Sequence, residues 1–185
     1  MSPMVKLPLT LEHALLGFVR TQPTHAYEIH QRLEQAEALG LVWHLKQSQL
    51  YALLARLEEA GYLASTTEPQ GNRPPRKVLQ LTPSGHAAFT RWMTTPVEHG
   101  RDFRQEFMAK LFFAQQDGSK TAAALLELQR NACQRWLAGL RGQLAVVDPS
   151  RTYETLVLRF RIGQLEAILT WLDACTVTLL EPAPR

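Results

Sequence analysis

The chain has 185 residues, 45% of them hydrophobic, and a formal net charge of +3 at neutral pH, which fits one or two ordinary folded domains. No apolar run approaches the roughly 20 residues of a transmembrane helix, and the N-terminal residues lack the apolar segment of a secretory signal. Cys133 and Cys175 form no metal-spaced pair, so we expect reduced thiols, a cytoplasmic protein, and neither a metal nor a cofactor.

Three helices are predicted in the first sixty residues. Apolar residues at helical spacing predict the first over residues 11–19 and the second over residues 24–39. The third, over residues 47–60, has the clearest pattern, and Gly61 follows it where helices often end in the left-handed conformation. Residues 41–43 fit either a short strand or an extended link. The first part of the chain therefore opens with a helical bundle.

A two-stranded hairpin is predicted after the third helix. Residues 62–67 and 76–81 have strand patterns, and residues 68–75, which are rich in proline and glycine, are predicted to be the loop between them. A further helix opens with Pro83 and ends before Pro96. Three helices, a hairpin and a fourth helix, in this order, are typical of a winged helix.

The rest of the chain has helical patterns and no strand pattern. Long amphipathic helices are expected over residues 101–115, 119–144 and 152–179, the last with apolar residues near heptad spacing. We therefore predict a mainly α fold, with an N-terminal winged helix-turn-helix domain over residues 1–96 and a helical dimerisation domain over residues 97–185. Three apolar-faced helices carry more hydrophobic surface than one small subunit covers, which predicts a dimer.

Polar residues at the start of the third helix and basic residues in the hairpin are the candidates for binding DNA. The second helix of a helix-turn-helix lies in the major groove, and its N-terminal residues contact bases. Glutamine suits adenine, serine suits several bases, and lysine suits guanine or phosphate. No acidic residue lies between Glu68 and Glu98, so the hairpin, or wing, attracts phosphates. The predicted DNA-binding residues are Lys46, Gln47, Ser48, Gln49, Tyr51, Arg73, Arg76 and Lys77.

Several segments resemble the PadR family of bacterial regulators. The first three are SQLYALLARLEEAGYL at residues 48–63, NRPPRK at residues 72–77 and LTPSGHAAF at residues 81–89. HAYEI at residues 25–29 resembles the start of the family's second helix. DFRQEFMAKLFF at residues 102–113 resembles the C-terminal domain of the virulence-activator-type members. The resemblance implies a homodimer on double-stranded operator DNA and, in many members, a small-molecule effector.

The sequence departs from the family pattern at two positions. Ala26 stands where glycine more often precedes the tyrosine, and Lys46 stands where a small polar cap of the recognition helix is common. Tyr51 belongs to the family motif, which supports its placement against the DNA backbone. The cap of the recognition helix is the part of the site that the resemblance does not supply.

Four aromatic residues of the second half fit either a dimer core or the wall of an effector pocket: Phe112, Trp136, Phe160 and Trp171. No nucleophile motif surrounds any serine, so no enzyme activity is expected. We predict a sequence-specific DNA-binding transcriptional regulator, acting as a repressor under small-molecule control. The alternative is a winged-helix module that binds protein and carries a helical dimerisation arm, which a polar but non-basic wing would favour.

Overall fold

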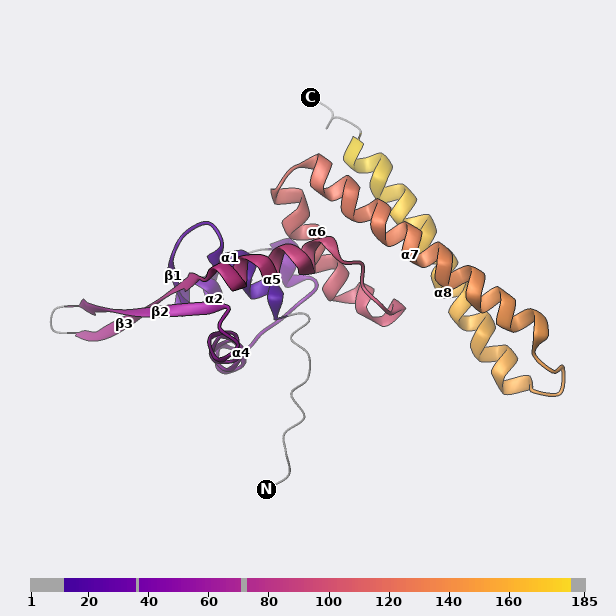
Figure 1. The fold of residues 1–185 in the computed structure, drawn as a ribbon, viewed down its shortest axis with the longest axis horizontal. Coiled ribbons are helices and arrows are strands. Elements are labelled where there is room, and N and C mark those ends of the chain that lie inside the picture. Colours follow the sequence, from indigo (N-terminus) through magenta and orange to yellow (C-terminus); the bar gives the residue numbers. More distant parts are fainter. Residues whose placement is uncertain (1–11, 36, 71–72, 181–185) are drawn as a thin grey trace, which may run out of the picture. The chain divides into compact units, whose positions relative to one another are not determined.

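The computed structural model describes residues 12–35, 37–70 and 73–180, without the side chains of residues 37, 38, 70, 73–75 and 180. The chain divides into two compact units (Figure 1). The first unit contains the residues up to Met93 together with Arg104–Phe113, and the second contains Thr94–Phe103 and the chain from Ala114 onward. The sequence therefore changes from one unit to the other three times between residues 93 and 114, because residues 104–113 pack with the first unit. The predicted boundary between residues 96 and 97 lies in this stretch.

The helical part of the first unit consists of α1 (His13–Val19), α2 (Ala26–Gln35), α3 (Glu37–Gly40) and α4 (Gln47–Glu59). Their apolar residues form its core. All side chains from Ala14 to Val19 are buried, and α4 buries Leu50, Leu54 and Leu57 at helical spacing. Residues 41–43 form a turn and not a strand, because the Trp43 N–H bonds back to the Leu39 carbonyl at 2.9 Å.

Helix α4 ends as its sequence predicts. Gly61 has a positive φ of 73°, which a residue with a side chain adopts only at a cost. The Gly61 N–H bonds to the Glu58 carbonyl at 2.8 Å, and the Tyr62 N–H bonds to the Leu57 carbonyl at 2.9 Å. These two bonds form a Schellman motif, which satisfies the last carbonyls of the helix and turns the chain toward the hairpin.

The sheet of the first unit has three antiparallel strands in the order β1-β3-β2: β1 (Thr24–His25), β2 (Leu63–Gln70) and β3 (Arg73–Leu81). Strand β1 was not expected, because Thr24 was predicted to begin the second helix. In the structure Thr24 pairs with Leu79, and His25 pairs with Val78. This short pairing fixes the start of α2 against the base of the wing.

The predicted loop over residues 68–75 is wrong. Strand pairing continues through Glu68 opposite Arg76 and Gln70 opposite Arg73, with an irregularity of register between Glu68 and Gln70. The prolines are tolerated because β1 pairs only with residues 78 and 79, so the outer part of β3 has a neighbour on one side. The wing is consequently a longer ribbon than the sequence indicates.

Helices α5 (Pro83–Thr94) and α6 (Glu106–Gln116) complete the first unit, with a 3₁₀ helix over Gly100–Arg104 before α6 in place of the predicted helical start at residue 101. The Phe113 ring of α6 lies edge-on to Phe18 and to Phe89, with ring centroids 5.3 and 5.6 Å apart. It also covers Gly17, where a Cβ atom would lie 2.5 Å from the ring. Residues 104–113 are therefore part of the first unit's core.

A buried ion pair within α6 also contacts Trp92 of α5. Lys110 is 1% exposed, and its Nζ lies 2.9 Å from Glu106 Oε1. The Trp92 Nε1–H donates to the same carboxylate oxygen at 3.1 Å, and the Lys110 ammonium lies over the Trp92 ring. Pairing and hydrogen bonding of this kind are what make a charge tolerable in a protein interior.

The second unit is built on a hairpin of α7 (Ser119–Val146) and α8 (Thr152–Leu180), which lie side by side in Figure 1. Ion pairs join them at Arg130–Asp173, 3.1 Å, and at Arg141–Glu166, 2.7 Å. The buried Gln129 side chain accepts the Val97 N–H at 2.8 Å and so holds the connecting segment to α7. Neither these nor the other helices in the described ranges are long and apolar enough to span a membrane.

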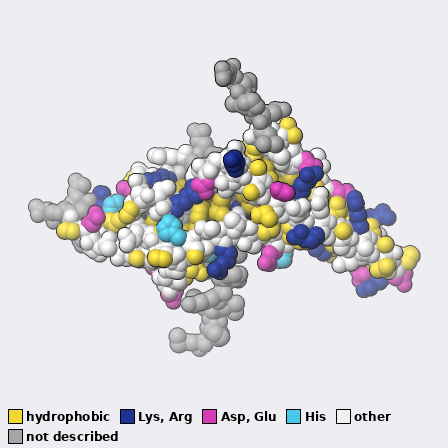
Figure 2. Space-filling view, turned by 45° about the horizontal axis from the view of Figure 1, so that its top comes forward, with side chains coloured by type: hydrophobic (Ala, Val, Ile, Leu, Met, Phe, Trp, Pro, Cys, Tyr) yellow, Lys and Arg dark blue, Asp and Glu magenta, His cyan; other side chains and the backbone are white. Residues whose placement is uncertain are grey.

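Helix α8 leaves much of its apolar surface uncovered. Among its described residues only Leu165 and Leu172 are buried hydrophobics, whereas Tyr153 is 79% exposed and Phe160 70% exposed. Leu156 is exposed as well, and the three lie at the i, i+3 and i+7 spacing of one helix face. Figure 2 shows hydrophobic side chains among charged ones on the surface of this hairpin.

Candidate nucleic-acid interface

The start of α4 presents a run of polar side chains to solvent. Lys46 precedes the helix in an extended conformation (φ −67°, ψ 147°), and the side chains of residues 46–49 are all exposed. The leucine face of α4 packs in the core, so the opposite face must point outward. The structure thus brings Lys46, Gln47, Ser48 and Gln49 together on one exposed helical turn.

Gln49 closes the first turn of α4 in place of a capping side chain. Lysine carries no hydrogen-bond acceptor, so Lys46 cannot cap the free N–H groups of the helix. The Gln49 Oε1 instead accepts the Lys46 backbone N–H at 3.1 Å, which is one half of a capping box. The amide oxygen of Gln49 is consequently engaged within the protein.

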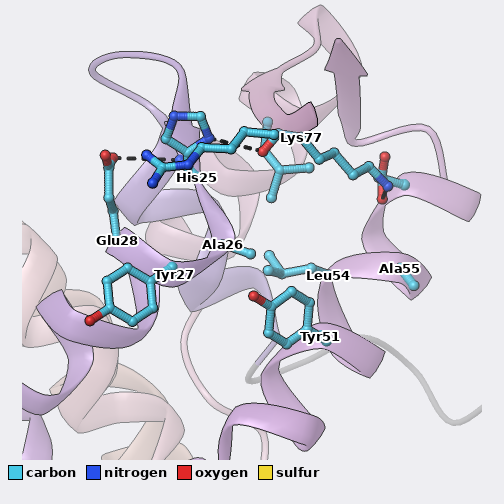
Figure 3. Close-up of a pocket in the computed structure, with 11 residues that line it drawn as sticks. His25, Ala26, Tyr27, Glu28, Tyr51, Leu54, Ala55 and Lys77 are labelled. Atoms are coloured by element: carbon cyan, nitrogen blue, oxygen red, sulfur yellow. Dashed lines mark hydrogen bonds and ion pairs between the residues drawn. The ribbon is translucent and has the colours of Figure 1, made fainter. Parts of the chain in front are cut away.

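A groove of about 510 Å³ runs between the start of α2, α4 and β3 (Figure 3). Tyr27 and Tyr51 lie along one side of it, and His25 and Lys77 lie along the other. Tyr51 is 47% exposed, and within the described part of the chain its hydroxyl makes no hydrogen bond. Its ring lines the groove beside the buried Leu54, so the hydroxyl is left to meet an external partner.

Lys77 is bound to a carboxylate of the recognition helix. Its Nζ lies 2.6 Å from Glu58 Oε2, and its backbone carbonyl accepts a hydrogen bond from the His25 Nδ1–H at 3.1 Å. The sequence predicts that Lys77 contacts phosphate. In the structure its ammonium holds the wing to α4 instead, so a phosphate would have to compete with Glu58.

The remaining basic residues of the wing lie further along β3. Arg76 is exposed and lines the groove, opposite Glu68 in the strand register. The backbone of Arg73 begins β3, and its side chain lies outside the described part of the structure. Of the three predicted basic residues, Arg76 is therefore the one whose side chain is exposed at the groove and makes no ion pair with a carboxylate of the described residues.

The start of α2 contributes a negative charge to the groove. The Thr24 hydroxyl donates to Glu28 Oε2 at 2.5 Å, and the His25 N–H donates to the same oxygen at 3.5 Å. The Thr24 bond holds the pKa of the Glu28 carboxyl below its ordinary value, against the smaller opposing effect of desolvation. Glu28 is charged at neutral pH and fixes the first turn of α2.

The four aromatic residues predicted for a dimer core or an effector pocket are not in one cluster. Phe112 belongs to the first unit, where its ring lies edge-on to Phe113 at 5.1 Å. Trp136 and Trp171 are half-buried in the second unit, and Phe160 is exposed there. Trp136 lines a cavity of about 630 Å³ together with Arg135, Arg161 and Gln164.

Sequence reasoning missed Tyr27 and Glu58. Glu58 lies seven residues after Tyr51, which places the two on one face of α4, and this spacing is a signal that the sequence did contain. Tyr27 lies two residues before the buried Ile29, so it had to point away from the core. The ion pair between Glu58 and Lys77 needs the strand register and has no local signal.

A helical core, a short sheet with a long basic hairpin, and an exposed polar first turn on α4 define a winged-helix DNA-binding protein. Residues 15–91 match the Transcriptional regulator PadR-like family, and residues 103–179 match the Virulence activator alpha C-term domain. The Negative transcriptional regulator PadR of Bacillus subtilis is 30% identical over 132 residues, which is 71% of each chain. The chain belongs to the PadR family, and it is a transcriptional regulator and not an enzyme.

Further similarities extend over most of the chain. A probable transcriptional regulator of Mycobacterium tuberculosis is 27% identical over 192 aligned positions, covering 94% of this chain and 99% of the relative. Among solved structures, Bacillus subtilis PadR in complex with operator DNA is 25% identical, covers 91% of this chain and 98% of the other, and has a TM-score of 0.45. A PadR-like regulator from Bacillus cereus is 20% identical, with 95% and 98% covered and a TM-score of 0.42.

Proposed function

We propose that the chain is a cytoplasmic homodimeric repressor that binds an operator sequence-specifically. The observation that carries the proposal is the exposed polar turn at residues 46–49, next to a groove bordered by the wing. In a winged helix the recognition helix enters the major groove and the wing lies over the neighbouring backbone. The groove between α4 and β3 is thus the path on which a phosphate strand would run.

The contacts divide into those that read bases and those that hold phosphates. Gln47, Ser48 and Gln49 carry polar side chains that can form hydrogen bonds with base edges. Lys46, Tyr51 and Arg76 are suited to phosphate oxygens, because they are exposed around the same groove and helix start. Arg73 and Lys77 extend this set along the wing. Lys77 would have to break its ion pair with Glu58 in order to bind a phosphate.

The uncovered face of α8 supports the homodimer. Tyr153, Leu156 and Phe160 are exposed at the spacing of one helix face, and exposed apolar residues gathered in this way are typical of an interface. A second copy of α8 would remove these side chains from water. A symmetric dimer then presents two α4 helices to two half-sites about one helical turn of DNA apart.

Repression is supported by the relative from Bacillus subtilis, which is named a negative transcriptional regulator. Small-molecule control is supported by the cavity of about 630 Å³ in the second unit. Its lining includes Trp136, the basic residues Arg135 and Arg161 and the acidic residue Glu98, a mixture of apolar and charged groups suited to a small ligand.

Selection from a random DNA pool with the full-length protein tests the proposal. We expect one enriched sequence with two related half-sites. Arg76→Ala should weaken binding to selected and unrelated duplexes alike and reduce the salt slope by about two units per dimer. Arg130→Ala, which removes the same charge from the ion pair with Asp173, is the matched control and should leave the slope unchanged. Absence of enrichment, or equal effects of the two variants, would contradict the proposal.

A further inference from the structure

We infer that Gln49 reads its operator base through its amide N–H donors alone, and that it therefore selects guanine over adenine. The inference rests on the proposed DNA-binding function and adds the chemistry by which one position is read. It starts from the hydrogen bond that joins the Gln49 side chain to the backbone of Lys46, the residue immediately before the recognition helix α4.

The orientation of the Gln49 amide follows from its partner. The Lys46 backbone N–H is a donor and lies 3.1 Å from the Gln49 side chain, so the atom that faces it must be the oxygen. In the opposite orientation the Gln49 amide N–H groups would face the Lys46 backbone N–H, and no hydrogen bond could form. Because Lys46 has no acceptor of its own, Gln49 is the residue that supplies the side-chain cap at this turn.

The cap leaves the amide nitrogen as the free end of the side chain. Gln49 is exposed, so its two N–H donors are available at the helix start that would enter the major groove. A glutamine normally pairs with adenine by donating to N7 and accepting from the N6 amino group, and the second bond needs the amide oxygen. The oxygen keeps a second lone pair, but it is directed at the Lys46 N–H, so the amide would have to turn away from its cap to accept from the adenine amino group.

Guanine fits a donor-only side chain. Its major-groove edge presents two neighbouring acceptors, N7 and O6, whereas adenine presents one acceptor beside a donor. A fixed amide also loses little conformational freedom when it docks, which favours the base that it fits as it stands. The cap and the base preference are therefore two consequences of one side-chain orientation.

Two substitutions at position 49 separate the role of Gln49 as a helix cap from its role in recognising an operator base. Gln49→Ala removes both, and it identifies the operator position that Gln49 reads as the one where preference is lost. Gln49→Glu keeps an acceptor for the Lys46 N–H and removes the donors. The readouts are the melting temperature and the ratio of affinities for duplexes with guanine or adenine at that position, a ratio in which uniform losses cancel.

Gln47→Glu is the matched control for charge. It adds the same negative charge within the same exposed turn, two residues from the cap. It should lower affinity for every duplex, as Gln49→Glu does, and leave the preference at the Gln49 position intact. The comparison distinguishes loss of a donor from repulsion by the DNA backbone.

For the wild type we expect guanine to be favoured over adenine by about tenfold or more at this position. Gln49→Glu should lose that preference with a melting temperature close to wild type, and Gln49→Ala should lose it with a drop of about 1–4 °C. A preference for adenine, or an equal melting loss in both variants, would overturn the inference. If the wild type selects a sequence that all variants read alike, only this inference fails; if it selects none, the proposed function fails as well.

Discussion

The two units of the chain bury their apolar residues to very different extents. In the first unit, α1 is buried from Ala14 to Val19 and Phe113 fills the space above Gly17 so closely that a methyl group would not fit. In the second unit, α8 runs for 29 residues and leaves Tyr153 and Phe160 mostly in solvent. The first unit is complete within one chain, and the second has a hydrophobic face that its own chain does not cover.

This difference fits the proposed division of the chain between DNA binding and dimerisation. A DNA-reading unit must hold its helix start and wing in fixed positions, and a closed core with a buried ion pair at Lys110 does so. A dimerisation unit must keep apolar surface for a second copy. If the chain forms the proposed homodimer, the uncovered face of α8 is an expected property of one subunit.

The largest effect is expected from charging the exposed face of α8. Leu156→Lys with Phe160→Lys removes two apolar side chains from the proposed interface and places four like charges across it in a dimer. The dissociation constant of the dimer should rise by at least about 100-fold, as measured by sedimentation velocity. The control, Asn131→Lys with Gln134→Lys, adds the same charge at exposed polar positions of α7 and should remain dimeric. An unchanged dimer in the α8 variant would place the interface elsewhere.

Glycine-to-alanine substitutions compare the packing of the two units directly. Gly17→Ala places a Cβ atom 2.5 Å from the buried Phe113 ring and should lower the free energy of unfolding by about 1–3 kcal/mol. Gly142→Ala in α7 meets nothing within 4 Å and should raise it by about 0.5–1 kcal/mol through helix propensity. Chemical denaturation measures both. Changes of the same sign would show that the two sites do not differ in packing as described.

Tyr51→Phe removes only the hydroxyl at the edge of the groove. We expect the melting temperature to stay near wild type and operator binding to weaken by about 0.5–1.5 kcal/mol per half-site, the value of one hydrogen bond. Tyr153→Phe, which removes a hydroxyl from the second unit, is the control for the substitution itself. Reduced stability with unchanged DNA affinity would assign the Tyr51 hydroxyl to the fold.

The smallest effect concerns the ion pair between Lys77 and Glu58. Glu58→Gln releases the Lys77 ammonium and removes a negative charge beside the groove, so operator affinity should rise a few-fold and the salt slope should steepen. Glu34→Gln removes the same charge from the partner of His30 on α2. If both variants change the salt slope equally, the effect comes from net charge and not from Lys77.

The elements with strong local signals were predictable from sequence. The leucine spacing of α4, the glycine at its end and the long helices α7 and α8 appear as expected, because each depends on residues within a few turns. The loop over residues 68–75 was wrong, since proline content does not reveal that the outer part of β3 lacks a second neighbour. Strand β1 was missed because it exists through pairing with residues more than fifty positions away.

The candidate site shows the same limit at the level of side chains. Residues 46–49 were chosen from their polarity at a helix start, and the structure does place them together in solvent. The sequence could not show that Gln49 serves as the cap or that Lys77 is held by Glu58, because both depend on geometry. Residue types therefore identify the candidate DNA-binding surface. The contacts within the protein determine which donors, acceptors and charges of each side chain remain available to a ligand.

The central claim is that two copies of this chain read two half-sites of one operator. Sedimentation of the full-length protein with the duplex selected from a random pool tests it most directly. We predict two chains per duplex and half-sites separated by one helical turn of about 10 bp or a multiple of it. One chain per duplex, or an enriched sequence with a single half-site, would contradict the account.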